Sequence, residues 1–127
     1  MNEIIFETSW GEKLCFSPLI SKAIADKFDI ESEEWQGLAD MEFNSAASLV
    51  SRLGKRLPTS TELHELHLWL TKTSDRSWPI GVNAIWSSTK SRNGCHCSVL
   101  LFNANCDADN DSRHCFVSCV STICAEA

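Results

Sequence analysis

The sequence has no hydrophobic run long enough to cross a membrane and no excess of basic residues. Its longest apolar stretches, Ile80 to Trp86 and Ser98 to Phe102, fall far short of the roughly 20 residues that a transmembrane helix needs. The net charge of -6 repels phosphate backbones, and no stripe of Lys and Arg alternates with the aromatic residues. We therefore expect neither a nucleic-acid partner nor direct insertion of this segment into a membrane.

The first residues lack the features of a secretory signal. Met1 to Glu7 has no basic start, no long apolar stretch and no small-residue cleavage site. We therefore expect either a protein that stays inside the cell or a piece cut from a longer exported chain. The 127 residues correspond to about one domain, spanning 1–127, which is long enough to bury a core.

Catalytic motifs are missing as well. The sequence contains no paired carboxylates, phosphate-binding glycine loop or serine elbow. His96 and His114 each adjoin a cysteine, but neighbours in a strand point to opposite faces, so they do not make a nucleophile and base pair. We expect no enzyme activity and no cofactor, with calcium possible as a bound ion.

Cysteine, in contrast, is abundant and crowded. Six of the seven cysteines lie in the last third of the chain, a density typical of a disulfide framework in an oxidising compartment. A zinc site in a reducing cytosol is the competing interpretation, with Cys95-His96-Cys97 and His114-Cys115 as ligands, although paired Cys-x-x-Cys spacings are absent. The sequence favours disulfides between six of the seven cysteines, which are Cys15, Cys95, Cys97, Cys106, Cys115, Cys119 and Cys124.

Hydrophobic periodicity predicts helices in the first half of the chain and strands in the second. A short strand is expected at 3–8, helices at 18–28, 44–53 and 59–71, and a loop at 29–40 between the first two helices. Strands are expected at 82–86, 98–102 and 116–120. Helices followed by strands predict an α+β fold with an antiparallel sheet.

Two of these helices carry strong end signals. Gly54 stands where the second helix should stop, and Thr59 followed by Glu62 forms a capping box for the third. Pro58 disfavours helical angles at Leu57, which separates the two helices. This block is therefore expected to be structural.

Three blocks of the sequence resemble one family. The run Arg56-Leu57-Pro58-Thr59, the strand Trp86-Ser87-Ser88-Thr89 and the segment Phe116 to Val120 are similar, in this order, to the signature of bacterial C-type-lectin-like domains. Such domains cap the intimin and invasin group of outer-membrane adhesins. The resemblance covers about residues 43–120.

The resemblance implies a C-type-lectin-like fold, with two to three helices on a twisted antiparallel sheet. It also implies a disulfide-stapled adhesin tip at the C-terminal end of a longer, outer-membrane-anchored surface protein. Such a tip would attach the cell to a protein or glycan on host or neighbouring cells and would act in virulence. In those adhesins a cysteine on the helix before the Arg-Leu-Pro-Thr block commonly bridges to the closing strand. Here that helix has no cysteine, so Cys119 needs another partner, such as Cys15 or one of its neighbours.

Candidate binding residues are sought in the loops, because loops carry function more often than the scaffold does. We predict receptor contacts at four residues of types enriched at interfaces, which are Arg76, Trp78, Arg92 and Asn93. Trp86, in contrast, is expected in the core.

Two alternatives to the protein-binding adhesin remain open. The acidic turn with Asp107, Asp109 and Asp111 offers oxygen ligands for calcium, although an EF-hand pattern fails, and would make the domain a calcium-dependent lectin. A solvated turn is the simpler interpretation. The second alternative is an intracellular zinc-binding protein or effector that uses the cysteines and histidines. Two further histidines, His64 and His67, do not make a metal site by themselves, and His67 is expected in the core with one hydrogen bond.

Overall fold

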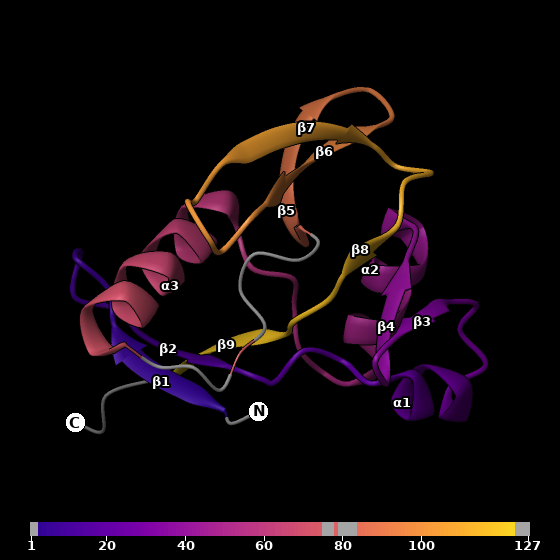
Figure 1. Cartoon of the computed structure of the whole chain (residues 1–127), viewed down its shortest axis with the longest axis horizontal. Helices are drawn as coiled ribbons and strands as arrows, with labels where there is room; N and C mark the ends of the chain where they lie inside the picture. Colours follow the sequence, from indigo (N-terminus) through magenta and orange to yellow (C-terminus); the bar gives the residue numbers. More distant parts are fainter. Residues whose placement is uncertain (1–2, 75–77, 79–83, 124–127) are drawn as a thin grey trace.

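The computed structural model describes residues 3–74, 78 and 84–123, and these ranges form helices and short strands in an α+β arrangement (Figure 1). The helices are α1 (Lys22–Lys27), α2 (Phe43–Arg52) and α3 (Ser60–Thr73). The strands are β1 (Ile4–Glu7), β2 (Lys13–Phe16), β3 (Glu33–Trp35), β4 (Leu38–Met41), β5 (Ile85–Arg92), β6 (Cys95–Val99), β7 (Cys106–Asn110), β8 (Cys115–Phe116) and β9 (Val120–Ile123). No helix in the described ranges is long and apolar enough to cross a bilayer.

The strands form two sheets. A three-stranded sheet has the order β1-β2-β9, and a six-stranded sheet has the order β3-β4-β8-β5-β6-β7. All pairings are antiparallel except that of β5 with β8, where Ile85 lies beside Phe116 in parallel. The sequence prediction of an α+β fold is confirmed, and the antiparallel sheet holds for every pair but this one.

The buried residues of the described ranges form two hydrophobic cores, and helix α3 covers the first of them. Thr59 caps the helix, since its side chain accepts from the Glu62 N–H while the Glu62 carboxylate accepts from the Thr59 N–H, so the predicted capping box is confirmed. His67 keeps one ring nitrogen 2.6 Å from the Leu101 carbonyl, so the expected hydrogen bond is present, but the residue is only half-buried and does not belong to the core. The helix buries an apolar face against the two sheets, with Leu63, Leu66 and Leu70 beside Phe6, Phe16 and Phe116.

Helix α2 covers the second core. It buries Leu49 and Val50 on one face, and Trp86 lies beneath it with no exposed surface. The Trp86 indole N–H donates to the Met41 carbonyl at 2.8 Å, and the Phe43 ring meets the indole edge-on with ring centres 5.5 Å apart. Trp86 is a core residue, as predicted.

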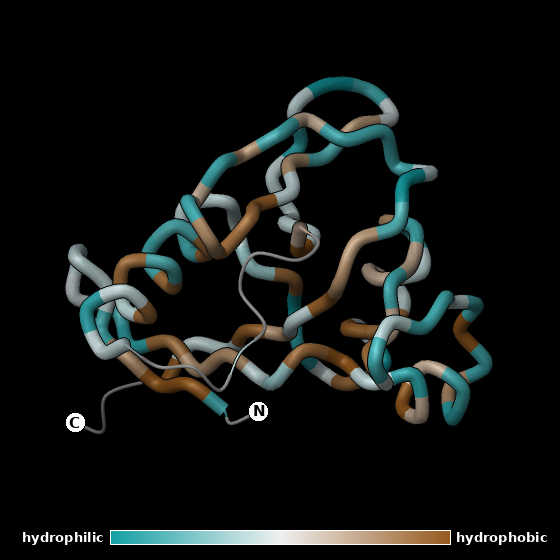
Figure 2. Tube along the Cα trace, in the orientation of Figure 1, coloured by the Kyte–Doolittle hydropathy of each residue, from teal (hydrophilic) through white to brown (hydrophobic). Residues whose placement is uncertain are grey.

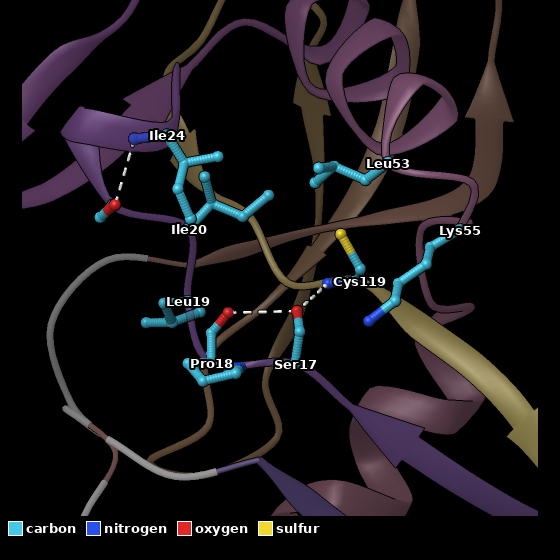
Figure 3. A pocket seen from close by; sticks show the side chains of 9 residues that line it. Ser17, Pro18, Leu19, Ile20, Ile24, Leu53, Lys55 and Cys119 are labelled. Atoms are coloured by element: carbon cyan, nitrogen blue, oxygen red, sulfur yellow. Dashed lines mark hydrogen bonds between the residues drawn. The ribbon is translucent and has the colours of Figure 1, made fainter. Parts of the chain in front are cut away.

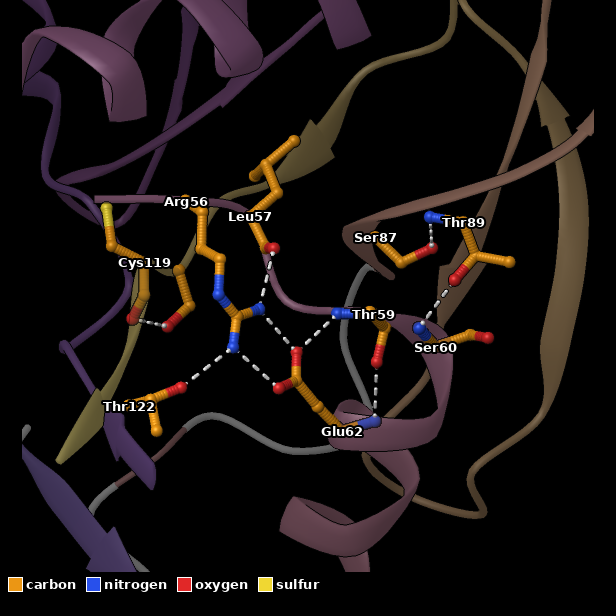
Figure 4. A network of polar contacts seen from close by, with 10 residues as sticks. Arg56, Leu57, Thr59, Ser60, Glu62, Ser87, Thr89, Cys119 and Thr122 are labelled. Atoms are coloured by element: carbon orange, nitrogen blue, oxygen red, sulfur yellow. Dashed lines mark hydrogen bonds and ion pairs between the residues drawn. The ribbon is translucent and has the colours of Figure 1, made fainter. Parts of the chain in front are cut away.

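The three sequence blocks that carry the family resemblance meet in space (Figure 4). The Ser88 N–H donates to the Pro58 carbonyl at 2.8 Å, and the Val120 N–H donates to the Arg56 carbonyl at 2.9 Å. The Ser60 N–H also donates to the Thr89 hydroxyl at 2.9 Å. These hydrogen bonds join α3, β5 and β9, so the blocks have a structural role.

The first helix is shorter than the sequence predicts. Ser17-Pro18 suggests a helix start, but the segment 17–20 is extended and runs along 117–119. The Ser17 N–H donates to the Cys119 carbonyl and the Ile20 N–H to the Val117 carbonyl, both at 2.8 Å. Tertiary pairing thus replaces helix formation, and α1 begins only after Ser21, whose hydroxyl accepts from the Ile24 N–H.

The loop predicted at 29–40 is largely a hairpin. Strands β3 and β4 pair in antiparallel register around Gln36 and Gly37, which have φ angles of 48° and 82°. Positive φ at both central residues gives the right-handed twist that a two-residue hairpin turn needs. A glutamine at the first of these positions is an unusual turn signal, which explains the wrong prediction.

The predicted strands are displaced in the second half of the chain. The strand expected at 98–102 is β6 at 95–99, and the one expected at 116–120 is split into β8 and β9 by the segment that pairs with 17–20. The strand expected at 82–86 is β5 at 85–92, with 82 and 83 outside the described residues. The acidic turn around Asp109 is strand β7, paired with β6. Figure 2 shows that hydrophilic residues predominate at this end of the sheet.

Candidate binding pocket

A largely apolar pocket of about 530 Å³ opens beside α1 and the end of α2. Its volume lies in the range of natural ligand sites. Figure 3 shows Ile20 and Ile24 on one side, Leu53 and Lys55 on the other, and the Cys119 sulfur pointing into the space between them. The complete lining is Ser17, Pro18, Leu19, Ile20, Ser21, Ile24, Leu53, Lys55 and Cys119.

Backbone pairing builds one wall of the pocket. Besides the two bonds between segments 17–20 and 117–119, the Ser118 hydroxyl donates to the Ser17 carbonyl at 2.8 Å and the Cys119 N–H donates to the Ser17 hydroxyl at 2.9 Å. The segment is therefore held rigidly. Because α1 begins only after Ser21, Ile24 is not turned into the core and keeps 39% of its surface exposed at the pocket.

The end of α2 builds the opposite wall. Gly54, with a φ of 71°, donates its N–H to the Ser51 carbonyl, and the Lys55 N–H donates to the Val50 carbonyl. These two bonds form a Schellman motif, which glycine favours because it adopts positive φ without a Cβ clash. The predicted helix stop at Gly54 is confirmed, and it places Leu53 and Lys55 at the pocket.

The chemistry of the pocket suits binding. Burial raises the pKa of the Cys119 thiol, and the Ser17 hydrogen bond and the Lys55 charge offset this only in part. The thiol therefore stays protonated at neutral pH and is not an activated nucleophile. The pocket offers apolar walls with one exposed ammonium group at its edge, from Lys55.

The structure describes three of the residues predicted to bind a receptor, and these three do not form one exposed surface. Trp78 is 2% exposed in the first core, so its prediction as an exposed loop contact is wrong. The free energy gained by burying the large apolar indole favours the core over the surface. Arg92 and Asn93 are exposed at the turn between β5 and β6, where the Arg92 Nε–H donates to the Cys95 sulfur at 3.4 Å. Arg76 lies outside the described residues.

The calcium candidates do not converge either. The Asp111 carboxylate lies 2.8 Å from His96 Nδ1, Asp109 accepts from the Ser98 hydroxyl and pairs with Arg113 at 3.5 Å, and Asp107 is exposed. The Asn105 amide also donates to the Asp107 carboxylate at 3.4 Å, so each of the three side chains has a protein partner. Across the described ranges, the three aspartates do not form a group of close metal ligands, whereas Glu33, Asp40 and His114 do. No cysteine of these ranges belongs to such a group either.

The described cysteines all stand as thiols in the structure. Cys97 and Cys106 lie two residues apart in the β6 and β7 register, on one face, and their side chains are hydrogen-bonded. Cys15 of β2 and Cys119, which directly precedes β9, have a similar diagonal relation, since Cys15 lies opposite Ser121. The disulfide framework stays a prediction, with Cys124 outside the described residues.

Thiol reactivity should differ sharply between two of these cysteines. Burial raises the pKa of the Cys115 thiol to about 12, and the nearby Asp109 charge adds to this. Cys106 also has its pKa raised, to about 11, but it is exposed. We expect iodoacetamide at about pH 8 to alkylate Cys106 of the reduced, folded chain well before Cys115. Peptide mapping by mass spectrometry measures both rates, and the chain in concentrated urea is the control; equal rates in the folded chain would contradict the prediction.

Sequence reasoning missed the pocket for a specific reason. Ile20 and Ile24 fall within the helix predicted at 18–28, and Leu53 and Lys55 flank the helix stop predicted at Gly54. The signal that could have found the pocket is the pair Ser17 and Ser21, since either hydroxyl can cap a helix. A start at Ser21 leaves Ile24 in the first turn.

One comparison with known proteins gives a result. The chain is similar in structure to the adhesin InvE of Yersinia pseudotuberculosis, with a TM-score of 0.58 and 16% sequence identity over 90% of this chain. The chain spans 33% of the length of the InvE structure. No family model matches the sequence, and no curated protein does. The shared feature is the fold.

Proposed function

We propose that this chain is a receptor-binding domain of a bacterial surface adhesin and that it binds a partner without catalysing a reaction. The observation that carries the proposal is the similarity to InvE, which extends over 90% of the chain. Fold alone does not fix function, so the proposal also depends on the site. The pocket supports binding because it is preformed, apolar and lined by rigid backbone segments.

The chain would act at the cell surface as one part of a longer protein. Its length corresponds to one third of the InvE structure, so a parent chain anchored in the outer membrane would carry it. The domain would have the C-type-lectin-like fold implied by its three sequence blocks. The parent chain would display it to host or neighbouring cells.

The proposed contact is an apolar side chain of a protein receptor, with a carboxylate beside it. The walls formed by Ile20, Ile24 and Leu53 favour an apolar group, because burying a sugar there would leave its hydroxyls unpaired. Lys55 is exposed at the edge, where an acidic neighbour would complement it. The rigid walls reduce the ordering cost of binding.

Binding to cells tests the proposal directly. The purified, fluorescently labelled chain is titrated onto cultured epithelial cells and onto bacteria. We expect saturable binding to one of them. The Ile24→Glu variant should bind at least about tenfold more weakly, since a buried, unpaired carboxylate costs more than about 1.4 kcal/mol.

A matched control separates the pocket from the rest of the surface. Ile5 is 47% exposed on β1, and Ile5→Glu introduces the same charge outside the pocket. We expect this variant to bind as the wild type does. Equal binding of both variants would reject the pocket as the contact, and absence of saturable binding to either cell type would reject the adhesin function.

A further inference from the structure

Outside the pocket, three potential metal ligands from neighbouring strands lie close together. His114 Nδ1 is 3.2 Å from Asp40 Oδ1 and 3.8 Å from Glu33 Oε1, and all three ligand atoms lie within 4.8 Å of one another. Four-coordinate zinc, with bonds of about 2.0–2.1 Å, holds its ligands roughly 3.3 Å apart. The Asp40 and His114 atoms therefore already have the spacing of a zinc site, and the Glu33 carboxylate lies close enough to join them.

The sheet register fixes this arrangement. Glu33 of β3 lies opposite Asp40 of β4, and Asp40 lies opposite Phe116 of β8. His114 precedes Phe116 by two residues, so its side chain is directed to the same face of the sheet. The three ligands thus come from three adjacent chain segments whose backbones are already paired, and little reorganisation is needed to bind an ion.

The charges in this cluster also favour a cation. The Asp40 side chain is only 11% exposed, and a buried carboxylate is costly unless it is paired. In the described part of the chain, neither Asp40 nor Glu33 forms an ion pair with a lysine or arginine, and His114 is the partner of both. Two carboxylates and a neutral imidazole would neutralise one divalent ion.

We propose that Glu33, Asp40 and His114 bind one Zn²⁺ ion, with water as the fourth ligand. An imidazole nitrogen beside two carboxylates suits Zn²⁺ better than Ca²⁺, which prefers oxygen ligands alone. His114 is 33% and Glu33 73% exposed at the side chain, so the ion is reached from solvent. The ion ties the β3–β4 hairpin to the strand at 115–116.

Cobalt absorption tests the site without interference from the cysteines. The reduced chain is freed of metal with a chelator, which is then removed, and is titrated with Co²⁺, which replaces zinc and absorbs visible light when four-coordinate. We expect one equivalent of Co²⁺ to bind without the near-ultraviolet thiolate-to-cobalt band, and Zn²⁺ to displace it. A strong thiolate band, or binding that is lost in Cys97→Ser and Cys106→Ser variants, would overturn the proposal.

Ligand variants and a matched histidine control complete the test. Glu33→Gln, at an exposed position, and His114→Gln should each weaken Co²⁺ binding by at least about tenfold. His96 lies 2.8 Å from Asp111 and forms a histidine–carboxylate pair without a second carboxylate, so His96→Gln should bind Co²⁺ as the wild type does. Unchanged affinity in both ligand variants would overturn the proposal and leave the His114 contact with Asp40 as a structural hydrogen bond.

Discussion

Replacement of Trp86 by alanine should destabilise the chain by about 3–5 kcal/mol, because it leaves a cavity in the second core. The indole is fully buried, and its loss also leaves the Met41 carbonyl without its hydrogen-bond donor. Since a domain of this size is stable by roughly 5–15 kcal/mol, the change removes a large share of the total. Urea unfolding followed by circular dichroism measures it, since this signal does not depend on a particular tryptophan.

A second tryptophan provides the control for this prediction. Trp10 is 50% exposed, and Trp10→Ala should change stability by no more than about 0.5 kcal/mol. The destabilisation by Trp86→Phe should lie between these two values, because phenylalanine keeps most of the apolar contact but loses the hydrogen-bond donor. This variant replaces Trp86→Ala in the test if the alanine variant does not fold. A Trp86→Ala variant as stable as Trp10→Ala would contradict the assignment of this residue to the core.

Two helix ends were predicted correctly from local signals, because the residues that form these ends lie within a few positions of one another. The capping box at Thr59 and the stop at Gly54 depend on side chains and φ angles within a few residues. Trp86 is predicted in the core because it ends the apolar run from Ile80 to Trp86. These features need no knowledge of distant segments, which is why the sequence alone was enough.

Features that depend on distant pairing were predicted poorly. Ser17-Pro18 carries a helix-start signal, yet four hydrogen bonds to residues 117–119 hold this segment extended. The β3–β4 hairpin uses Gln36 at a positive φ, a position that glycine or asparagine usually marks. At Ser17-Pro18 tertiary contacts outweigh local propensity, and in the hairpin the turn lacks its usual residue.

The two candidate sites were missed for the same reason. The pocket joins residues near 20, 53 and 119, and the proposed zinc ligands lie at 33, 40 and 114. Only the fold brings such distant positions together. The calcium candidates Asp107, Asp109 and Asp111, which the sequence left open beside a solvated turn, lie close together along the chain. In the structure their side chains lie within hydrogen-bond distance of protein donors.

Glu62 should account for much of the stability of the junction between α3 and β9. Both of its oxygens accept from the Arg56 guanidinium, at 2.7 and 2.8 Å, and one also accepts from the Thr59 N–H. Glu62→Ala should cost about 2–4 kcal/mol, from the lost cap and the lost charge-assisted bonds. The cost stays below that of a fully buried pair because the Arg56 side chain is 43% exposed and can be rehydrated.

Glutamine at position 62 separates the ion pair from the cap. A Gln side chain also completes a capping box, so Glu62→Gln should keep the Thr59 contact and lose only the charge, at a cost of about 1 kcal/mol near pH 7. Burial on its own raises the pKa of Glu62, but the hydrogen bonds from Arg56 and Thr59 outweigh it and hold the pKa below its ordinary value of 4.5. A carboxylate with a depressed folded-state pKa stabilises the fold above its unfolded-state pKa and loses this contribution as the pH falls through the folded-state value.

The stability difference between wild type and Glu62→Gln should therefore be largest near neutral pH and shrink as the pH falls below 4.5. Urea unfolding of both proteins across this range measures the difference at each pH. Glu34, exposed on β3, provides a control, since Glu34→Gln should show no comparable loss at neutral pH. A difference between wild type and Glu62→Gln that stays constant from neutral to acidic pH would show that the Arg56 pair does not stabilise the fold through charge. The cap at Thr59 would then be the main contribution of this residue.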